Sequence, residues 1–163
     1  MNFETWQYGK STGFVQAEYW RGVLIASSMI PPVEKLILAA AKEGVEVVLA
    51  YALKSYSQQL EIRRINVIDK SKVDDEEYLK TANPGLFKPE TGLPGWSKHQ
   101  QAKAVDFKVT GRPAVYAWLV RNAEKFSFFR TVPSERWHWE YWPDNTDKFF
   151  KVPKNHATWD GLV

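Results

Sequence analysis

Residues 97–109 read SKHQQAKAVDFKV, and residues 135–141 read ERWHWEY. In the first stretch, a polar segment with His99 leads into a short predicted strand over 104–109 that carries Asp106. The second stretch alternates large aromatic and polar residues, which is typical of a strand with one wet face. These two stretches therefore predict two strands of one sheet, each close to side chains that can bind a metal.

The rest of the chain predicts helices and strands in irregular order. Pro31-Pro32 can open a helix to about Glu43, since apolar residues recur there at helical spacing. The β-branched run VEVVLA over 45–50 predicts a buried strand. Further helices are expected over 55–64 and 112–122, and an ordered loop over 83–95. The predicted fold class is α+β, with a small, mainly antiparallel central sheet flanked by helices in one compact domain over residues 1–163.

Composition restricts the possible functions. The chain has 163 residues, 44% hydrophobic and 25% charged, which are values for one globular domain. It contains no cysteine, which excludes disulfides, iron–sulfur clusters and cysteine nucleophiles. The net charge of +3 and the scattered basic residues do not indicate a nucleic-acid partner, although they suit an anionic surface. The aromatic fraction of 15% can build a core or line a groove for an amphipathic ligand.

The distribution of apolar residues argues against targeting and membrane segments. The longest apolar stretch, GVLIASSMI over 22–30, lies late in the chain and ends at Pro31-Pro32. It lacks the order of a signal peptide and falls short of the ~20 apolar residues of a membrane span. We therefore expect synthesis in the cytoplasm without a signal peptide, and no membrane span.

Three histidines are the main candidates for chemistry: His99, His138 and His156. If His99, Asp106 and His138 meet at one point, they leave one position open on a tetrahedral zinc ion, as in a catalytic site. Glu135 is then a candidate base, provided that it lies at an irregular start of its strand. The alternative is that the three are ordinary surface or core residues. His156 stands in a polar tail and is expected to be solvated.

Three segments resemble one peptidase family. Residues 97–106 resemble the S-x-H-x-x-G-x-A-x-D motif of the zinc D-alanyl-D-alanine peptidases, and residues 135–138 resemble their E-x-W-H motif. Residues 54–59, KSYSQQ, are similar to the family's Y-R-S-Y-x-x-Q segment. The family includes VanY-like carboxypeptidases, VanX-like dipeptidases and phage L-alanyl-D-glutamate endolysins. The likeness spans a motif-bearing core of about residues 32–143.

The resemblance implies a role for individual residues. It gives one Zn²⁺ per chain, at the base of a cleft on the central sheet, with three ligands, one base and three substrate-binding residues. Glu135 is the implied catalytic base, and Ser97 has a supporting or substrate-contacting role. Lys54 is expected to anchor a carboxylate or offset charge on the carbonyl oxygen. Independently of the resemblance, Trp137 is expected either to wall the cleft or to belong to ordinary core packing. The implied zinc ligands are His99, Asp106 and His138.

Two residues depart from the family pattern. Ala102 replaces the motif glycine, which matters if the position needs a positive φ. Lys54 replaces an arginine and loses its planar bidentate fork. Arg63, Arg64 and Arg136 are candidates to compensate for that loss.

The expected function is zinc-dependent hydrolysis of an amide bond in the peptidoglycan stem peptide by a monomer that acts on the cell wall. Both a D,D-carboxypeptidase-like and a phage endolysin-like role fit, the latter with release through a membrane lesion made by another protein. Residues 134–141 look closer to the VanY-like carboxypeptidases. The alternative is a catalytically weakened, zinc-stabilised module that binds cell-wall peptides or a protein.

Overall fold

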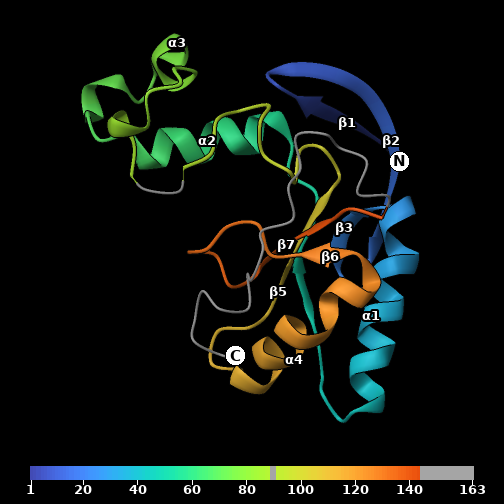
Figure 1. Cartoon of the computed structure of the whole chain (residues 1–163). Helices are drawn as coiled ribbons and strands as arrows, with labels where there is room; N and C mark the ends of the chain where they lie inside the picture. Colours follow the sequence, from blue (N-terminus) through green and yellow to red (C-terminus); the bar gives the residue numbers. More distant parts are fainter. Residues whose placement is uncertain (89–90, 144–163) are drawn as a thin grey trace.

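The computed structural model describes residues 1–88 and 91–143. In these residues the strands form two antiparallel sheets (Figure 1). The N-terminal sheet has the strand order β1-β2-β3, and the central sheet has the order β4-β5-β7-β6. All neighbouring strands are antiparallel. The strands are β1 (Asn2–Gln7), β2 (Lys10–Trp20), β3 (Val23–Ala26), β4 (Leu49–Tyr51), β5 (Ala104–Phe107), β6 (Phe128–Phe129) and β7 (His138–Tyr141).

In the described residues, four α-helices accompany the sheets. They are α1 (Ile30–Lys42), α2 (Tyr56–Asn66), α3 (Glu76–Leu79) and α4 (Pro113–Asn122), with short 3₁₀ turns at Ser27–Met29, Lys70–Lys72, Pro84–Leu86 and Ala123–Phe126. The first turn of α2 is fixed by a capping box, in which Ser55 and Gln58 satisfy each other's backbone N–H groups. α2 leads away from the central sheet toward α3 (Figure 1).

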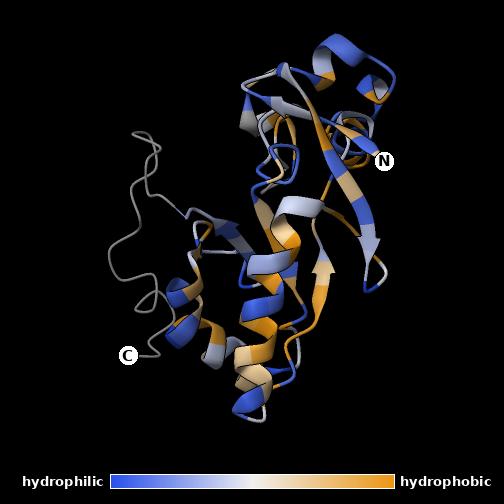
Figure 2. Cartoon of the chain, turned by 90° about the vertical axis from the view of Figure 1, so that its right-hand side faces the viewer, coloured by the Kyte–Doolittle hydropathy of each residue, from blue (hydrophilic) through white to orange (hydrophobic). Residues whose placement is uncertain are grey.

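The main hydrophobic core lies between α1, α4 and the central sheet. Val33 and Leu36 of α1 are fully buried, together with Phe107 of β5 and Trp139 of β7. In Figure 2, α1 faces the viewer and carries both hydrophilic and hydrophobic residues, as expected for a helix with one buried face. This core fixes the positions of β5 and β7, the two strands that support the functional site.

The predicted α+β class with a small antiparallel central sheet flanked by helices is confirmed. The helices at 30–42, 56–66 and 113–122 match the predicted ranges closely. None of the helices in the described ranges is long and apolar enough to cross a bilayer.

Three parts of the chain differ from the predictions. The N-terminal sheet was not predicted, because the outer face of β2 is largely exposed and gives no apolar alternation. The strand predicted over 45–50 begins only at Leu49. The strand predicted over 135–141 begins only at His138, because its first residues form turns in which Glu135 N–H bonds to Val132 O and His138 N–H bonds to Glu135 O.

Candidate metal centre

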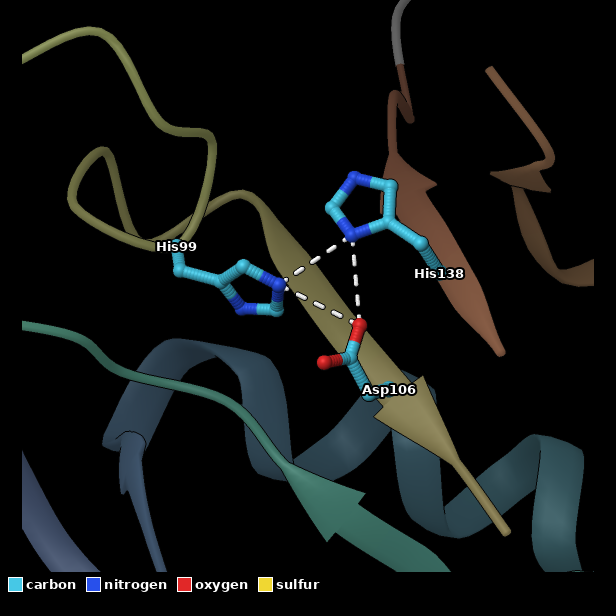
Figure 3. A group of neighbouring side chains, drawn as sticks. All are labelled: His99, Asp106 and His138. Atoms are coloured by element: carbon cyan, nitrogen blue, oxygen red, sulfur yellow. Dashed lines mark hydrogen bonds and ion pairs between the residues drawn. The ribbon is translucent and has the colours of Figure 1, made fainter. Parts of the chain in front are cut away.

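Three side chains from separate parts of the chain meet at one point. His99 Nε2 lies 3.1 Å from His138 Nδ1 and 3.2 Å from Asp106 Oδ1, and His138 Nδ1 lies 3.2 Å from the same oxygen (Figure 3). Ligand atoms about 2.0–2.1 Å from a tetrahedral zinc ion are themselves about 3.3 Å apart. The three atoms therefore already have the spacing of ligands around a single ion.

The central sheet produces this convergence. Asp106 in β5 and His138 in β7 are direct cross-strand partners, so their side chains share one face of the sheet. His99 comes from the series of turns that precedes β5 and is 4% exposed. The site is therefore a candidate metal centre on the sheet, and its donors, two imidazoles and one carboxylate, suit zinc.

Hydrogen bonds behind the two imidazoles set their tautomers. His99 Nδ1 lies 2.6 Å from the Ala52 carbonyl oxygen and can only donate to it, which leaves the Nε2 lone pair toward the centre. His138 Nε2 lies 3.4 Å from Glu140 Oε1, an arrangement in which Nε2–H donates to the carboxylate and Nδ1 faces the centre. Backbone and carboxylate partners of this kind orient metal-bound histidines.

Glu140 was expected on the same strand face as His138, but no role was predicted for it. Its carboxylate is buried and also accepts hydrogen bonds from Thr131 Oγ1 at 2.7 Å and Trp142 Nε1 at 2.9 Å. These bonds, together with the charge of His138, outweigh burial and lower the pKa of Glu140. The signal that could have predicted this role is the i, i+2 spacing from His138, since residues two apart share one face of a strand.

The electrostatics of the cluster favour one negative and one positive charge when no metal is bound. Burial would raise the pKa of Asp106, but hydrogen bonds from His138 and His99 outweigh it and hold that pKa far below its usual range. Burial would lower the pKa of His138, but hydrogen bonds and charges from Asp106 and Glu140 raise it to about 9. A metal ion that binds Nδ1 near neutral pH therefore displaces a proton.

Glu135 lies next to the three side chains without belonging to their triangle. Its Oε2 is 3.8 Å from His138 Nδ1, and it projects from the turn before β7 into the groove over the centre. The irregular strand start, which the sequence analysis set as the condition for this approach, is present. A carboxylate at this position can exchange a proton with a water molecule at the open ligand position.

A groove of about 530 Å³ lies over the centre. Lys54, Ser97 and Trp137 all line it, together with the three candidate ligands. Burial lowers the pKa of Lys54, and the charges of Asp106 and Glu135, which line the same groove, act in the opposite direction. The three residues expected to bind substrate therefore face the same space as the candidate ligands.

The arginines considered as substitutes for Lys54 lie elsewhere. Arg63 is buried and donates to the carbonyl oxygens of Leu79, Thr81 and Thr91, while Arg64 pairs with Glu61. Arg136 is in the turn before β7, where its guanidinium lies 5.2 Å from the Tyr116 ring centre. None of the three is among the residues that line this groove, and Arg136 lines a neighbouring pocket together with Trp137.

Three further predictions from the sequence concern the paired tryptophans, Ala102 and His156. Trp137 and Trp139 were expected on one strand face, but only Trp139 is in the strand and buried, whereas Trp137 is 39% exposed in the preceding turn. Ala102 has φ +54°, so the position does use the conformation that favours glycine. His156 lies outside the described residues.

Comparison with known proteins places the chain among cell-wall peptidases. The family model of VanY, D-alanyl-D-alanine carboxypeptidase, matches residues 23–144. The structure is similar to a mutant of the vancomycin-resistance D,D-pentapeptidase VanY from a VanB-type cassette in complex with Zn(II), with 29% identity, 78% of each chain covered and a TM-score of 0.59. It is also similar to VanYB in complex with D-alanine-D-alanine, with 26% identity, 84% of each chain covered and a TM-score of 0.62.

A more distant structure shares the fold alone. The LdcB LD-carboxypeptidase has 23% identity and a TM-score of 0.52, with 72% of this chain and 59% of that chain covered. No curated protein matches the chain at a significant level.

Proposed function

Because the chain belongs to the VanY family of D-alanyl-D-alanine carboxypeptidases, we propose that it is a zinc peptidase that hydrolyses the D-alanyl-D-alanine bond at the end of the peptidoglycan stem peptide. The observation that carries the proposal is the triangle of His99, Asp106 and His138, with Nε2 of His99 and Nδ1 of His138 both directed inward and Glu135 beside it. The proposal takes residues 1–163 as one peptidase unit that holds one Zn²⁺ and acts on the cell wall as a monomer.

The residues of the centre divide the chemistry between them. His99, Asp106 and His138 would hold the zinc ion, which when bound supplies Lewis acidity and lowers the pKa of a coordinated water. Glu135 accepts the proton of the attacking water and returns it to the nitrogen of the leaving amine. The neutral amine then leaves as D-alanine.

Substrate recognition falls to the groove around the centre. Lys54 brings a positive charge close to the carboxylates of Asp106 and Glu135, and Lys88 and Lys98 line other parts of the same groove. A C-terminal carboxylate of the substrate supplies the partner for that ammonium, which favours cleavage at the end of a peptide over cleavage within it. Ser97 and Trp137 line the same groove and contact the flanking residues of the peptide.

Two departures from the family pattern, Ala102 and Lys54, are the reasons to consider a catalytically weakened binding module, and the first of them no longer supports it. The turn at Ala102 forms in spite of the methyl group, with Lys103 N–H bonded to Lys98 O at 3.0 Å. The other support, Lys54, keeps a positive charge in the groove. A module that only binds also has no use for a carboxylate at the position of Glu135.

Incubation of the zinc-loaded protein with a stem pentapeptide that ends in D-alanyl-D-alanine tests the proposal. Mass spectrometry should identify free D-alanine and a tetrapeptide, and a chelator should abolish their release. A matched peptide with an amidated C-terminus should be cleaved poorly, since it lacks the carboxylate for Lys54. Internal cleavage products would instead favour the endolysin-like role, and absence of any product would favour the binding module.

A further inference from the structure

The β1–β2 hairpin presents aromatic side chains to solvent and lies outside residues 23–144, which match the family model. Tyr8 at its turn is 47% exposed, and Phe14 on β2 is 69% exposed. The inner face of the hairpin packs on the core through Phe3 and Val15. The exposed aromatic residues are therefore not needed for packing, and gathered aromatic residues of this kind mark binding surfaces.

The hairpin is attached directly to the loop that carries His99. Gly9 N–H donates to Gly95 O at 3.1 Å, and Trp6 N–H donates to Gln100 O at 2.9 Å. The two glycines are in such close contact that a Cβ on Gly95 would lie 2.6 Å from Gly9 Cα. The hairpin and the loop therefore form one surface next to the metal groove.

Two aromatic pairs lie on this surface. The rings of Tyr8 and Trp96 are 5.1 Å apart in an edge-to-face arrangement, and those of Trp6 and Tyr56 are 4.4 Å apart. The first pair borders the groove, because Trp96 lines it. The second pair lines a neighbouring pocket on the other side of the hairpin's contact with the loop. The groove over the metal centre thus continues into an aromatic surface.

A second pocket, of about 530 Å³, lies between the hairpin and the first turn of α2. It combines aromatic rings with an amide, a carboxylate and hydroxyl groups. Sugars need this combination, since the C–H face of the ring stacks on an aromatic side chain while its hydroxyls bond to polar groups. The lining residues are Asn2, Phe3, Glu4, Trp6, Phe14, Ser55, Tyr56 and Ser57.

We propose that this surface, formed by Trp6, Tyr8, Phe14, Tyr56 and Trp96, binds the glycan strand of peptidoglycan while the metal groove holds the stem peptide. The inference rests on the proposed function and adds a second part of the same substrate. A stem peptide of five residues spans at most about 17 Å, so the sugar that bears it must lie close to the groove during hydrolysis. The aromatic surface occupies such a position.

The test compares the stem pentapeptide with the same peptide attached to its N-acetylglucosaminyl-N-acetylmuramyl disaccharide. In a Tyr8→Asn/Phe14→Ser variant, KM for the disaccharide-peptide should rise about tenfold, as loss of two aromatic contacts implies. Asparagine suits the positive φ of Tyr8, +52°. Hydrolysis of the free peptide should stay unchanged, which also reports an intact fold.

Tyr19→Ser is the matched control, because Tyr19 is 68% exposed on the same hairpin but belongs to neither aromatic pair and lines neither pocket. It should leave both substrates unaffected. An unchanged KM for the disaccharide-peptide in the double variant, or an equal rise for both substrates, would overturn the proposal.

A binding measurement keeps the inference separate from the peptidase activity. Peptide-free oligosaccharide of alternating N-acetylglucosamine and N-acetylmuramic acid is titrated into the full chain and followed by NMR. Wild type and Tyr19→Ser should bind it, whereas the double variant should bind at least about tenfold more weakly. Binding would support the glycan surface even if no peptide is cleaved, and a wild-type protein that does not bind the oligosaccharide would contradict it.

Discussion

The metal centre and the β1–β2 hairpin are neighbours built on opposite principles. The centre is buried, and its two imidazoles are held by hydrogen bonds on the side away from the metal position. His99 bonds to the Ala52 carbonyl oxygen, and His138 bonds to the Glu140 carboxylate. The hairpin is exposed and carries its aromatic residues on an outer face that the core does not need. The first region suits chemistry at one fixed point, and the second suits adaptable binding of an extended ligand.

Removal of one candidate ligand should have the largest effect on zinc affinity and hydrolysis, and this effect should not extend to the hairpin. His99→Ala or Asp106→Ala leaves two of the three protein ligands. Loss of a residue that only hydrogen-bonds to a ligand lowers metal affinity by up to ~100-fold, so loss of a ligand itself should lower zinc affinity by more. Metal content and hydrolysis should disappear together. Asp74→Ala, which changes a carboxylate outside the groove, is the control. Full zinc occupancy in His99→Ala would exclude this residue as a ligand.

Loss of the carboxylate behind His138 should have a smaller effect on the same centre. Glu140→Gln removes the charge that orients the imidazole, so zinc affinity should fall about 10–100-fold. Thr131→Val is the matched control, because it removes another partner of Glu140 and leaves the contact with His138. Competition with a chromophoric chelator measures the change. Equal affinities of Glu140→Gln and wild type would show that the hydrogen bond has no part in metal binding.

Zinc binding should strengthen with pH up to about pH 9. The pKa of His138 is raised from 6.5 to about 9 in the metal-free fold, so a bound proton competes with zinc below that value. The same shift means that the contribution of His138 to the stability of the metal-free fold is fully present below pH 6.5 and is lost as the pH rises toward 9. Affinity should change about tenfold per pH unit between 6.5 and 9 if one proton is displaced. Zinc titrations that release no proton at pH 7 would contradict the protonated state.

The smallest effect concerns the turn between the ligands. Ala102→Gly relieves a left-handed alanine and should raise the free energy of unfolding by about 1 kcal/mol. Zinc affinity should not change. Ala41→Gly in α1 should have the opposite sign, with a loss of about 1 kcal/mol, because glycine is unfavourable within a helix. Denaturant titration compares the two variants, and destabilisation by Ala102→Gly would show that the turn is not strained.

The sequence predicted most of the central sheet and the three candidate ligands that meet on it. It did not predict the hairpin or the hydrogen-bond partners behind the two histidines. His99, Asp106 and His138 stand out because their spacing and motifs are local features of the sequence. The carbonyl of Ala52 behind His99 cannot be found this way, since it depends on a contact across 47 positions. The hairpin was missed because exposed Phe14 and Tyr19 on β2 obscure the alternation that identifies a strand.

Turnover by zinc-loaded Glu135→Gln protein is the most direct test of the central claim. Glutamine fills the same space but cannot take a proton from water, so the variant should bind one zinc ion per chain as wild type does and should cleave the D-alanyl-D-alanine peptide at least about 100-fold more slowly. Near wild-type turnover with full zinc occupancy, or undiminished turnover after complete removal of the metal, would contradict the account.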